Sequence, residues 1–268
     1  MKFFDSYHLP ATLDEGLDLL ARYNGRARVI AGGTDLLIDL QSEYYQGERP
    51  HYDALIDVTR LPGACEILEE DGRIVIGCGV THAQLSESGL IRGRATALAE
   101  AAELIGGPQV RNAATLVGNV AHALPAADGT VALLALGAEA QVARRGSGLD
   151  WRPLPALFRG PGQSAVDATR EIITALRFPD TRGGEGSAFS RIMRPQGVAL
   201  PILAMAARLR MSGGVIDSAA ISVGPAGPVP FRAVRTEASL LGRPLSAETL
   251  SEAGELLQGE VSLRTSPH

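Results

Sequence analysis

Two segments rich in small residues carry the residue types best suited to binding a ligand. The first, Ala31-Gly32-Gly33-Thr34-Asp35, follows a short apolar run and precedes a pattern typical of a helix. Glycines let the backbone approach a ligand closely, and amide groups at the start of a helix favour an anion. The segment therefore suits a phosphate, but a strand-glycine-helix turn is more often only a tight turn, and alone it favours that reading.

The second segment runs from Ala114 to Asn119 and continues through His122 to Asp128. It combines small residues with a hydroxyl and an amide, and two such loops could close on one diphosphate. Asp128 alone is explained as a favourable charge at a helix N-terminus. We expect His122 to pack or to form a hydrogen bond rather than bind a metal.

The sequence shows no spacing typical of a metal site, a nucleophilic triad or an iron–sulfur cluster. The five histidines lack metal-ligand spacing, and no nucleophilic triad emerges, so we expect no metal site and no catalytic side chain. Cys65 and Cys78 are too few to hold an iron–sulfur cluster. Arg191 and Arg194 are read first as a solvated basic turn, and as the sharper option as contacts to an anionic cofactor.

Composition narrows the function further. The 268 residues carry a net charge of −5 without a block of Lys or Arg, which argues against nucleic-acid and anionic-membrane binding. The longest apolar run, Val198–Ala207, is far shorter than the roughly 20 residues that span a bilayer. The N-terminus lacks the apolar core of a signal peptide, so we expect a cytoplasmic protein.

Strands and helices must position these loops, and the pattern interleaves them. Thr12 is a predicted N-cap, Asp71-Gly72 predicts a hairpin, and a polar, glycine-rich boundary spans 179–186. The segments 42–52, 105–111 and 114–120 are predicted to be loops. The predicted strands are Arg28–Ile30, Ala54–Val58, Glu66–Glu69, Arg73–Cys78, Ala138–Ala143, Glu171–Phe178 and Val215–Val223. The predicted helices begin after Thr12, after Thr81 and at Pro125, and cover Ala95–Leu104, Ala199–Leu209, Arg232–Leu241 and Ala247–Leu257.

The two loops in this order resemble the FAD-binding medium subunit of molybdenum hydroxylases, the xanthine dehydrogenase and aerobic carbon monoxide dehydrogenase family. The matching motifs are Ala31-Gly32-Gly33-Thr34-Asp35-Leu36-Leu37, Gln109-Val110-Arg111-Asn112, Thr115-Leu116-Val117-Gly118-Asn119 and Pro125-Ala126-Ala127-Asp128. The resemblance covers nearly the whole chain. It implies an α+β fold of the p-cresol methylhydroxylase (PCMH) type. Two α+β lobes, residues 1–58 and 59–179, would hold the flavin between them, and a C-terminal α+β lobe would span 185–268.

The resemblance also implies which residues bind FAD. The diphosphate would lie against the two loops, with Asp128 bonded toward the sugar-like chain or the flavin. Ile105 and Gly106 would lie near the isoalloxazine, and Ile173 and Arg191 would flank the adenine end and the flavin. The full implied set is Ala31, Gly32, Gly33, Thr34, Asp35, Ile105, Gly106, Ala114, Thr115, Gly118, Asn119, Ala121, Leu124, Asp128, Ile173 and Arg191.

Three departures from the family pattern stand out. Val117 replaces a usual glycine, and a β-branched residue resists positive φ, so either that loop is shifted or the position is ordinary. Residues 194–199 replace the frequent Arg-x-Gly-Asp-aromatic-Ala stretch, so no aromatic or acidic contact carries over. Relatives usually continue beyond residue 268 into another helix, so the protein is either naturally short or lacks that helix.

The resemblance implies an electron-transfer oxidoreductase subunit. FAD would receive electrons from a small 2Fe–2S subunit, supplied by a large molybdopterin subunit, in a heterotrimer that can dimerise. NAD, oxygen or a quinone would be the final acceptor. Two alternatives stay open: a flavin-free assembly subunit, with Val117 as the lesion, and a self-sufficient flavin oxidase. The flavin's colour separates the first alternative from the main hypothesis. Against the second, the first loop has no histidine or cysteine placed for covalent flavin attachment.

Overall fold

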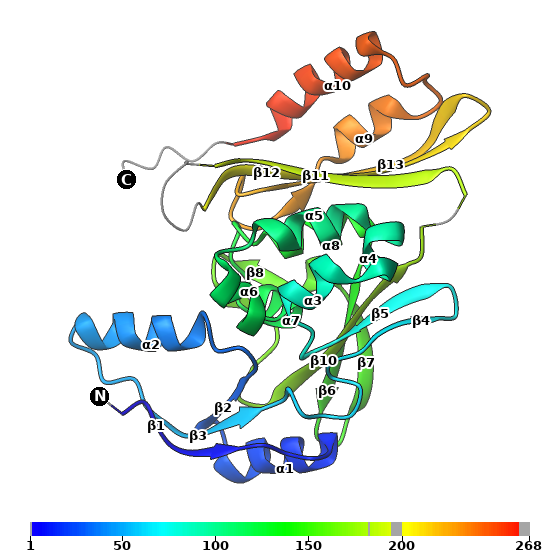
Figure 1. Cartoon of the computed structure of the whole chain (residues 1–268). Coiled ribbons are helices and arrows are strands. Elements are labelled where there is room, and N and C mark those ends of the chain that lie inside the picture. Colours follow the sequence, from blue (N-terminus) through cyan, green and yellow to red (C-terminus); the bar gives the residue numbers. More distant parts are fainter. Residues whose placement is uncertain (1, 182, 194–199, 263–268) are drawn as a thin grey trace.

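The computed structural model describes residues 2–181, 183–193 and 200–262, and its three larger β-sheets follow one another along the molecule (Figure 1). The fold is α+β, as predicted. A large apolar core joins the first two sheets, the helices next to them and the near side of β11 and β12, and a smaller core lies between the C-terminal sheet and the last two helices. Within the described residues, no helix is long and apolar enough to cross a membrane.

The N-terminal sheet has three parallel strands in the order β1-β3-β2. Thr12 accepts a hydrogen bond from the Glu15 amide and so begins α1, which ends at Asn24 in the left-handed conformation. The strand β2 leads directly into the first glycine loop. The elements are β1 (Phe4–His8), α1 (Leu13–Tyr23), β2 (Ala27–Ile30), α2 (Leu36–Tyr45) and β3 (Tyr52–Asp57).

The middle sheet has five antiparallel strands in the order β4-β5-β10-β6-β7. Its predicted hairpin turn is confirmed, because Asp71 and Gly72 both have positive φ, 49° and 70°. The strands are β4 (Ile67–Glu70), β5 (Arg73–Gly77), β6 (Glu139–Arg144), β7 (Gly148–Pro153) and β10 (Glu171–Pro179). A short 3-10 helix η1 (Leu154–Leu157) precedes a small pair, β8 (Phe158–Gly160) and β9 (Gln163–Ser164).

A layer of helices separates the middle sheet from the C-terminal sheet (Figure 1). Every residue of α8 is buried, and this helix and α5 pack against the C-terminal strands. A helix begins after Thr81, as predicted, and Thr81 caps α3 with a complete capping box. The helices are α3 (His82–Glu87), α4 (Gly89–Arg94), α5 (Thr96–Leu104), α6 (Pro108–Ala113), α7 (Leu116–Ala121) and α8 (Asp128–Leu136).

The C-terminal sheet has four antiparallel strands in the order β11-β12-β13-β14, with α9 and α10 on the side away from α5 and α8 (Figure 1). Strand β11 is therefore an edge strand. The elements are β11 (Glu185–Met193), β12 (Pro201–Ser212), β13 (Val215–Gly224), β14 (Phe231–Arg232), α9 (Val234–Leu240) and α10 (Ala247–Glu260).

Several sequence predictions were wrong. The predicted helix 199–209 is the strand β12 over its described part, which pairs with β11 and β13 and packs against α8. The buried Ala204 and Ala206 alternate with the exposed Met205. Tertiary pairing outweighs the helix propensity of its alanines. The segments 105–111 and 114–120 contain the short helices α6 and α7. Helix α2 extends into the predicted loop 42–52, and α8 begins at Asp128 instead of Pro125. The strands β1, β7 and β11 were not predicted.

Candidate functional site

The two glycine-rich segments meet backbone to backbone. A Cβ atom built on Gly32 would lie 2.0 Å from the carbonyl oxygen of Ala113, so only glycine permits this approach. Gly33 has a φ of +68°, a conformation that suits glycine. The structure thus brings together two segments that are about eighty residues apart in the sequence, as predicted.

The first segment presents free backbone donors. Within the residues that the structure describes, the amide groups of Gly32, Gly33, Thr34 and Asp35 have no hydrogen-bond acceptor. All four residues are partly exposed, and helix α2 begins directly after them. Such a row of amides at a helix start favours an anionic ligand.

The second segment is built differently, as a short helix held by side chains. The Thr115 hydroxyl accepts a hydrogen bond from the Gly118 amide at 3.0 Å and so caps α7. Val117 is helical, buried at 6% exposure, and packed in the core. Its position does not require positive φ, so of the two readings of this departure, the structure supports an ordinary position.

Asn119 connects the second segment to the next helix. Its Oδ1 accepts a hydrogen bond from the Thr130 amide at 3.1 Å and lies 3.4 Å from the Thr130 hydroxyl. Thr130 lies in the first turn of α8, whose amides need acceptors. Asn119 therefore satisfies part of this helix start, a role that the sequence did not reveal.

A buried ion pair closes one side of the site. Arg191, on β11, donates through Nη1 to Asp128 Oδ2 and through Nη2 to the Leu104 carbonyl at 2.6 Å. The side chains are only 5% and 4% exposed, and burial raises the pKa of Asp128 to about 6 despite the arginine. The reading of Arg191 as part of a solvated turn was wrong. Arg194 lies outside the described residues.

Each partner of this ion pair keeps an unsatisfied atom. Asp128 Oδ1 and Arg191 Nε are buried, and neither has a hydrogen-bond partner in the described part of the chain. Leaving such atoms unsatisfied costs free energy. A ligand with polar groups would satisfy them.

His122 joins the two segments by side chains. Its Nε2 lies 2.9 Å from Asp39 Oδ2, and its Nδ1 lies 3.6 Å from Asp35 Oδ1. This confirms the expectation that His122 forms hydrogen bonds. The pKa of Asp35 is raised, chiefly because the carboxyl is partly buried. The negative charge of Asp39 adds to this shift, and His122 opposes it.

Two basic residues near the site were not singled out from the sequence. Arg111 donates through Nη1 to the carbonyls of Ile105 and Gly106, at 3.2 and 2.9 Å. His82 is 1% exposed, its amide donates to the Ala114 carbonyl, and burial together with Arg111 lowers its pKa to about 4. The Gln109–Asn112 motif was a signal for Arg111, but its contacts depend on the turn that the fold creates.

The remaining predicted residues lie around the two segments. Ala114 is buried, and Ala121 ends α7, which packs against β10. Ile173 is buried on β10, whereas Leu124 is 39% exposed.

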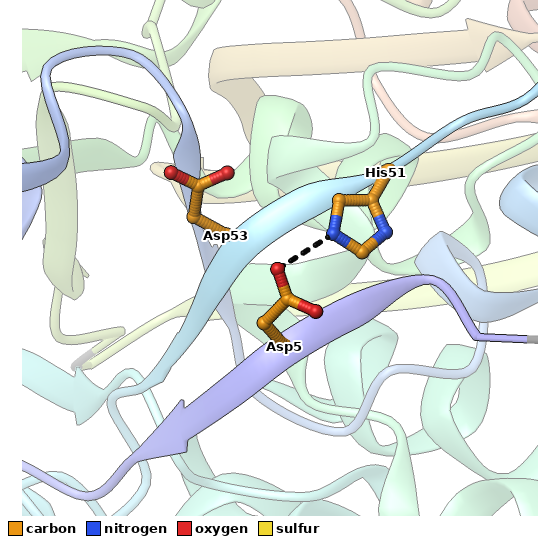
Figure 2. Close-up of side chains that lie close together, drawn as sticks. All are labelled: Asp5, His51 and Asp53. Carbon is orange, nitrogen blue, oxygen red and sulfur yellow. Dashed lines mark hydrogen bonds and ion pairs between the residues drawn. The ribbon is translucent and has the colours of Figure 1, made fainter.

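Asp5 on β1, Asp53 on β3 and His51, just before β3, form a separate cluster (Figure 2). Their side-chain ligand atoms lie within 4.8 Å of one another, which the sequence spacing did not suggest. However, Lys2 lies 2.8 Å from Asp5, and Arg26 lies 2.6 Å from Asp53. Ion pairs account for both carboxylates, so we infer no metal site from them.

Comparisons with known proteins agree with this geometry. Residues 2–181 match the family described as the FAD binding domain in molybdopterin dehydrogenase, and residues 187–268 match the CO dehydrogenase flavoprotein C-terminal domain. A xanthine dehydrogenase FAD-binding subunit from Escherichia coli O157:H7 is 32% identical over 98% of this chain and 88% of its own length. A nicotinate dehydrogenase FAD-subunit from Eubacterium barkeri is 30% identical over 97% of this chain and 87% of its own.

A solved structure gives the same result for the fold. Carbon monoxide dehydrogenase from Hydrogenophaga pseudoflava matches with a TM-score of 0.89 and 27% identity, covering 99% of this chain and 89% of that chain. The whole described fold is therefore shared, including the C-terminal sheet.

Proposed function

The chain belongs to the FAD-binding subunits of molybdenum hydroxylases, a family of oxidoreductase complexes, and we propose that it serves such a complex as its electron-transfer flavoprotein. When bound, FAD supplies the redox chemistry, taking electrons from iron–sulfur clusters of a partner subunit and passing them to a final acceptor. The residues of this chain bind and orient the cofactor. This role requires no side chain of this chain to act as a catalytic acid or base.

The first segment would hold the FAD diphosphate. Four consecutive amides without acceptors, among the described residues, and the close approach of Gly32 to Ala113 support this assignment. The second segment would complete the cradle from the opposite side. The residues proposed for both sides are Ala31, Gly32, Gly33, Thr34 and Asp35, then Ala114, Thr115, Gly118, Asn119, Ala121 and Leu124.

The buried Asp128–Arg191 pair is the observation that carries the proposal. Its two unsatisfied atoms fit a ligand rich in hydroxyls and ring nitrogens, as FAD is. The proposed isoalloxazine neighbours are Ile105 and Gly106, and Ile173 would flank the adenine end. Since Arg191 comes from β11, the C-terminal lobe would contribute directly to the site.

The chain is proposed to divide into three lobes that correspond to its larger sheets. We propose a first FAD-binding lobe over 1–58, a second over 59–179 and a C-terminal lobe over 185–268. Each of the three larger sheets falls within one of these ranges, and the small β8-β9 pair falls within the second, which supports these bounds.

The electron-transfer role requires other chains. Cys65 and Cys78 are too few for a 2Fe–2S cluster, so a small iron–sulfur subunit and a large molybdopterin subunit are the proposed partners. NAD is a candidate final acceptor, and a cytoplasmic location is proposed from the sequence alone.

Removing and restoring FAD in the assembled complex tests the role. The complex would be stripped of FAD, reduced anaerobically, and assayed for cluster reduction and for electron delivery to external acceptors. We expect the clusters to reduce normally and delivery to fail until FAD is added back. Delivery at the original rate without FAD would instead favour the flavin-free assembly subunit.

A further inference from the structure

Arg111 is placed to shape the turn between α5 and α6. This turn contains Ile105 and Gly106, and the guanidinium group donates to both of their carbonyls, at 3.2 and 2.9 Å. Gly106 has a φ of +52°, and a Cβ built on it would lie 2.9 Å from the Val110 Cβ. The turn is therefore tightly fitted against α6 and fixed by one side chain.

Arg111 engages the carbonyl groups of the turn but not its amide groups. Both carbonyls bond to Arg111, whereas the amides of Gly106 and Gly107 have no acceptor among the residues that the structure describes. The turn thus keeps its donors free. Holding the carbonyls from one side leaves these donors available to a ligand on the other.

Among the residues that the structure describes, no carboxylate lies within ion-pair distance of Arg111, whose guanidinium bonds only to the two carbonyls. The adjacent His82 carries no negative charge. His82 is buried, and its pKa of about 4 leaves it neutral at physiological pH. A buried or partly buried charge acts over a longer range than an exposed one, because solvent screens it less.

We propose that Arg111 is a positioning residue for the flavin: it fixes the Ile105–Gly106 turn and places an uncompensated positive charge beside it. The inference rests on the proposed function, which assigns this turn to the isoalloxazine. A positive charge there stabilises the reduced flavin, which carries more negative charge than the oxidised form. Arg111 would therefore strengthen FAD binding and raise the reduction potential.

Two variants separate charge from geometry. Arg111→Gln removes the charge, and Arg111→Lys keeps the charge but loses the planar guanidinium. The matched control is Arg144→Gln, because Arg144 is exposed at the end of β6 and its side chain forms no hydrogen bond or ion pair with a described residue. For each full-length protein, circular dichroism would verify folding, and FAD affinity and midpoint potential would be measured.

We expect Arg111→Gln to weaken the binding of oxidised FAD at least tenfold, about 1.4 kcal/mol. A further tenfold loss for reduced FAD would make the midpoint about 30 mV more negative for a two-electron couple. Arg111→Lys should weaken binding as well but keep the midpoint near that of the wild type. Arg144→Gln should change neither quantity.

Other outcomes would overturn the inference. A folded Arg111→Gln protein with wild-type affinity and midpoint would remove Arg111 from the site while leaving the proposed function intact. Equal midpoint shifts in the glutamine and lysine variants would refute the role of the charge. A wild-type protein that fails to take up FAD would refute the proposed function itself, and this inference with it.

Discussion

The two sides of the candidate site are built by different means. The first side is the segment from Ala31 to Asp35, and it presents backbone amides shaped by two glycines. The second side comprises α7 and the buried Asp128–Arg191 pair, and its own side chains hold it in place. A glycine is therefore needed for the backbone geometry on the first side, whereas on the second side it is not.

On the first side, no other residue replaces the glycine at position 32. The obstacle to a Cβ is the backbone of Ala113, which has no flexible side chain to move away. On the second side, Gly118 lies in α7, and its Cβ would meet only the Thr115 hydroxyl, at 3.0 Å. Substitutions should therefore affect ligand binding on the first side far more than on the second.

The largest effect is expected for Gly32→Val. The new side chain would push the two segments apart, and overpacking of this kind costs up to about 3 kcal/mol or more. We expect FAD affinity to fall more than a hundredfold, measured by flavin fluorescence during titration of the FAD-free protein. Gly32→Ala already places a Cβ against Ala113 and should also lose affinity strongly, whereas its matched control Gly118→Ala should lose less than roughly tenfold. Equal losses in the two alanine variants would erase the difference between the two sides.

Part of this contrast could be predicted from the sequence. Gly32 and Gly33 follow an apolar strand and precede a helix, which alone favoured a tight turn; only together with the second segment, in the order typical of the family, did they predict a binding loop. The N-cap residues Thr12 and Thr81 and the Asp71-Gly72 turn were also predictable, because neighbouring residues determine them.

The second side depends on contacts between distant segments. Arg191 becomes buried only because β11 pairs with β12 and packs on α5, and its local sequence resembles a basic turn. The alanines of β12 likewise favour a helix until neighbouring strands pair with them. The sequence could not decide whether Val117 marks a shifted loop or an ordinary position, because that depends on α7 placing this side chain in the core.

The next variant, Val117→Gly, is expected to affect ligand binding less than Gly32→Val, and it tests whether Val117 is an ordinary core position. Val117→Gly restores the residue usual in the family, but it removes a buried side chain and places glycine in a helix. We expect a loss of about 3 kcal/mol in the free energy of unfolding, measured with denaturant, and unchanged FAD affinity.

Val117→Ala is the control for helix propensity and should lose less stability. A gain of flavin in Val117→Gly would contradict this comparison and would support the assembly-subunit hypothesis, in which Val117 is the lesion.

The smallest effect concerns the pH dependence of stability on the second side. The pKa of Asp128 is raised from 3.8 to about 6, chiefly by burial, so the folded protein binds this proton more tightly than the unfolded chain. The resulting stabilisation is complete below the unfolded pKa and is lost as pH rises through the folded value. Between pH 4.5 and 7, wild-type FAD-free protein should therefore lose roughly 2 kcal/mol relative to Asp128→Asn.

Asp35→Asn provides the corresponding measurement on the first side. Burial also raises the pKa of Asp35, but its side chain is 48% exposed, against 4% for Asp128. Its variant should show a pH dependence of the same sign and smaller size, because solvent reaches the carboxylate. If Asp128→Asn and wild type have parallel pH profiles, Arg191 fully compensates the buried charge. The second side would then be as tolerant of an ionised carboxylate as the first.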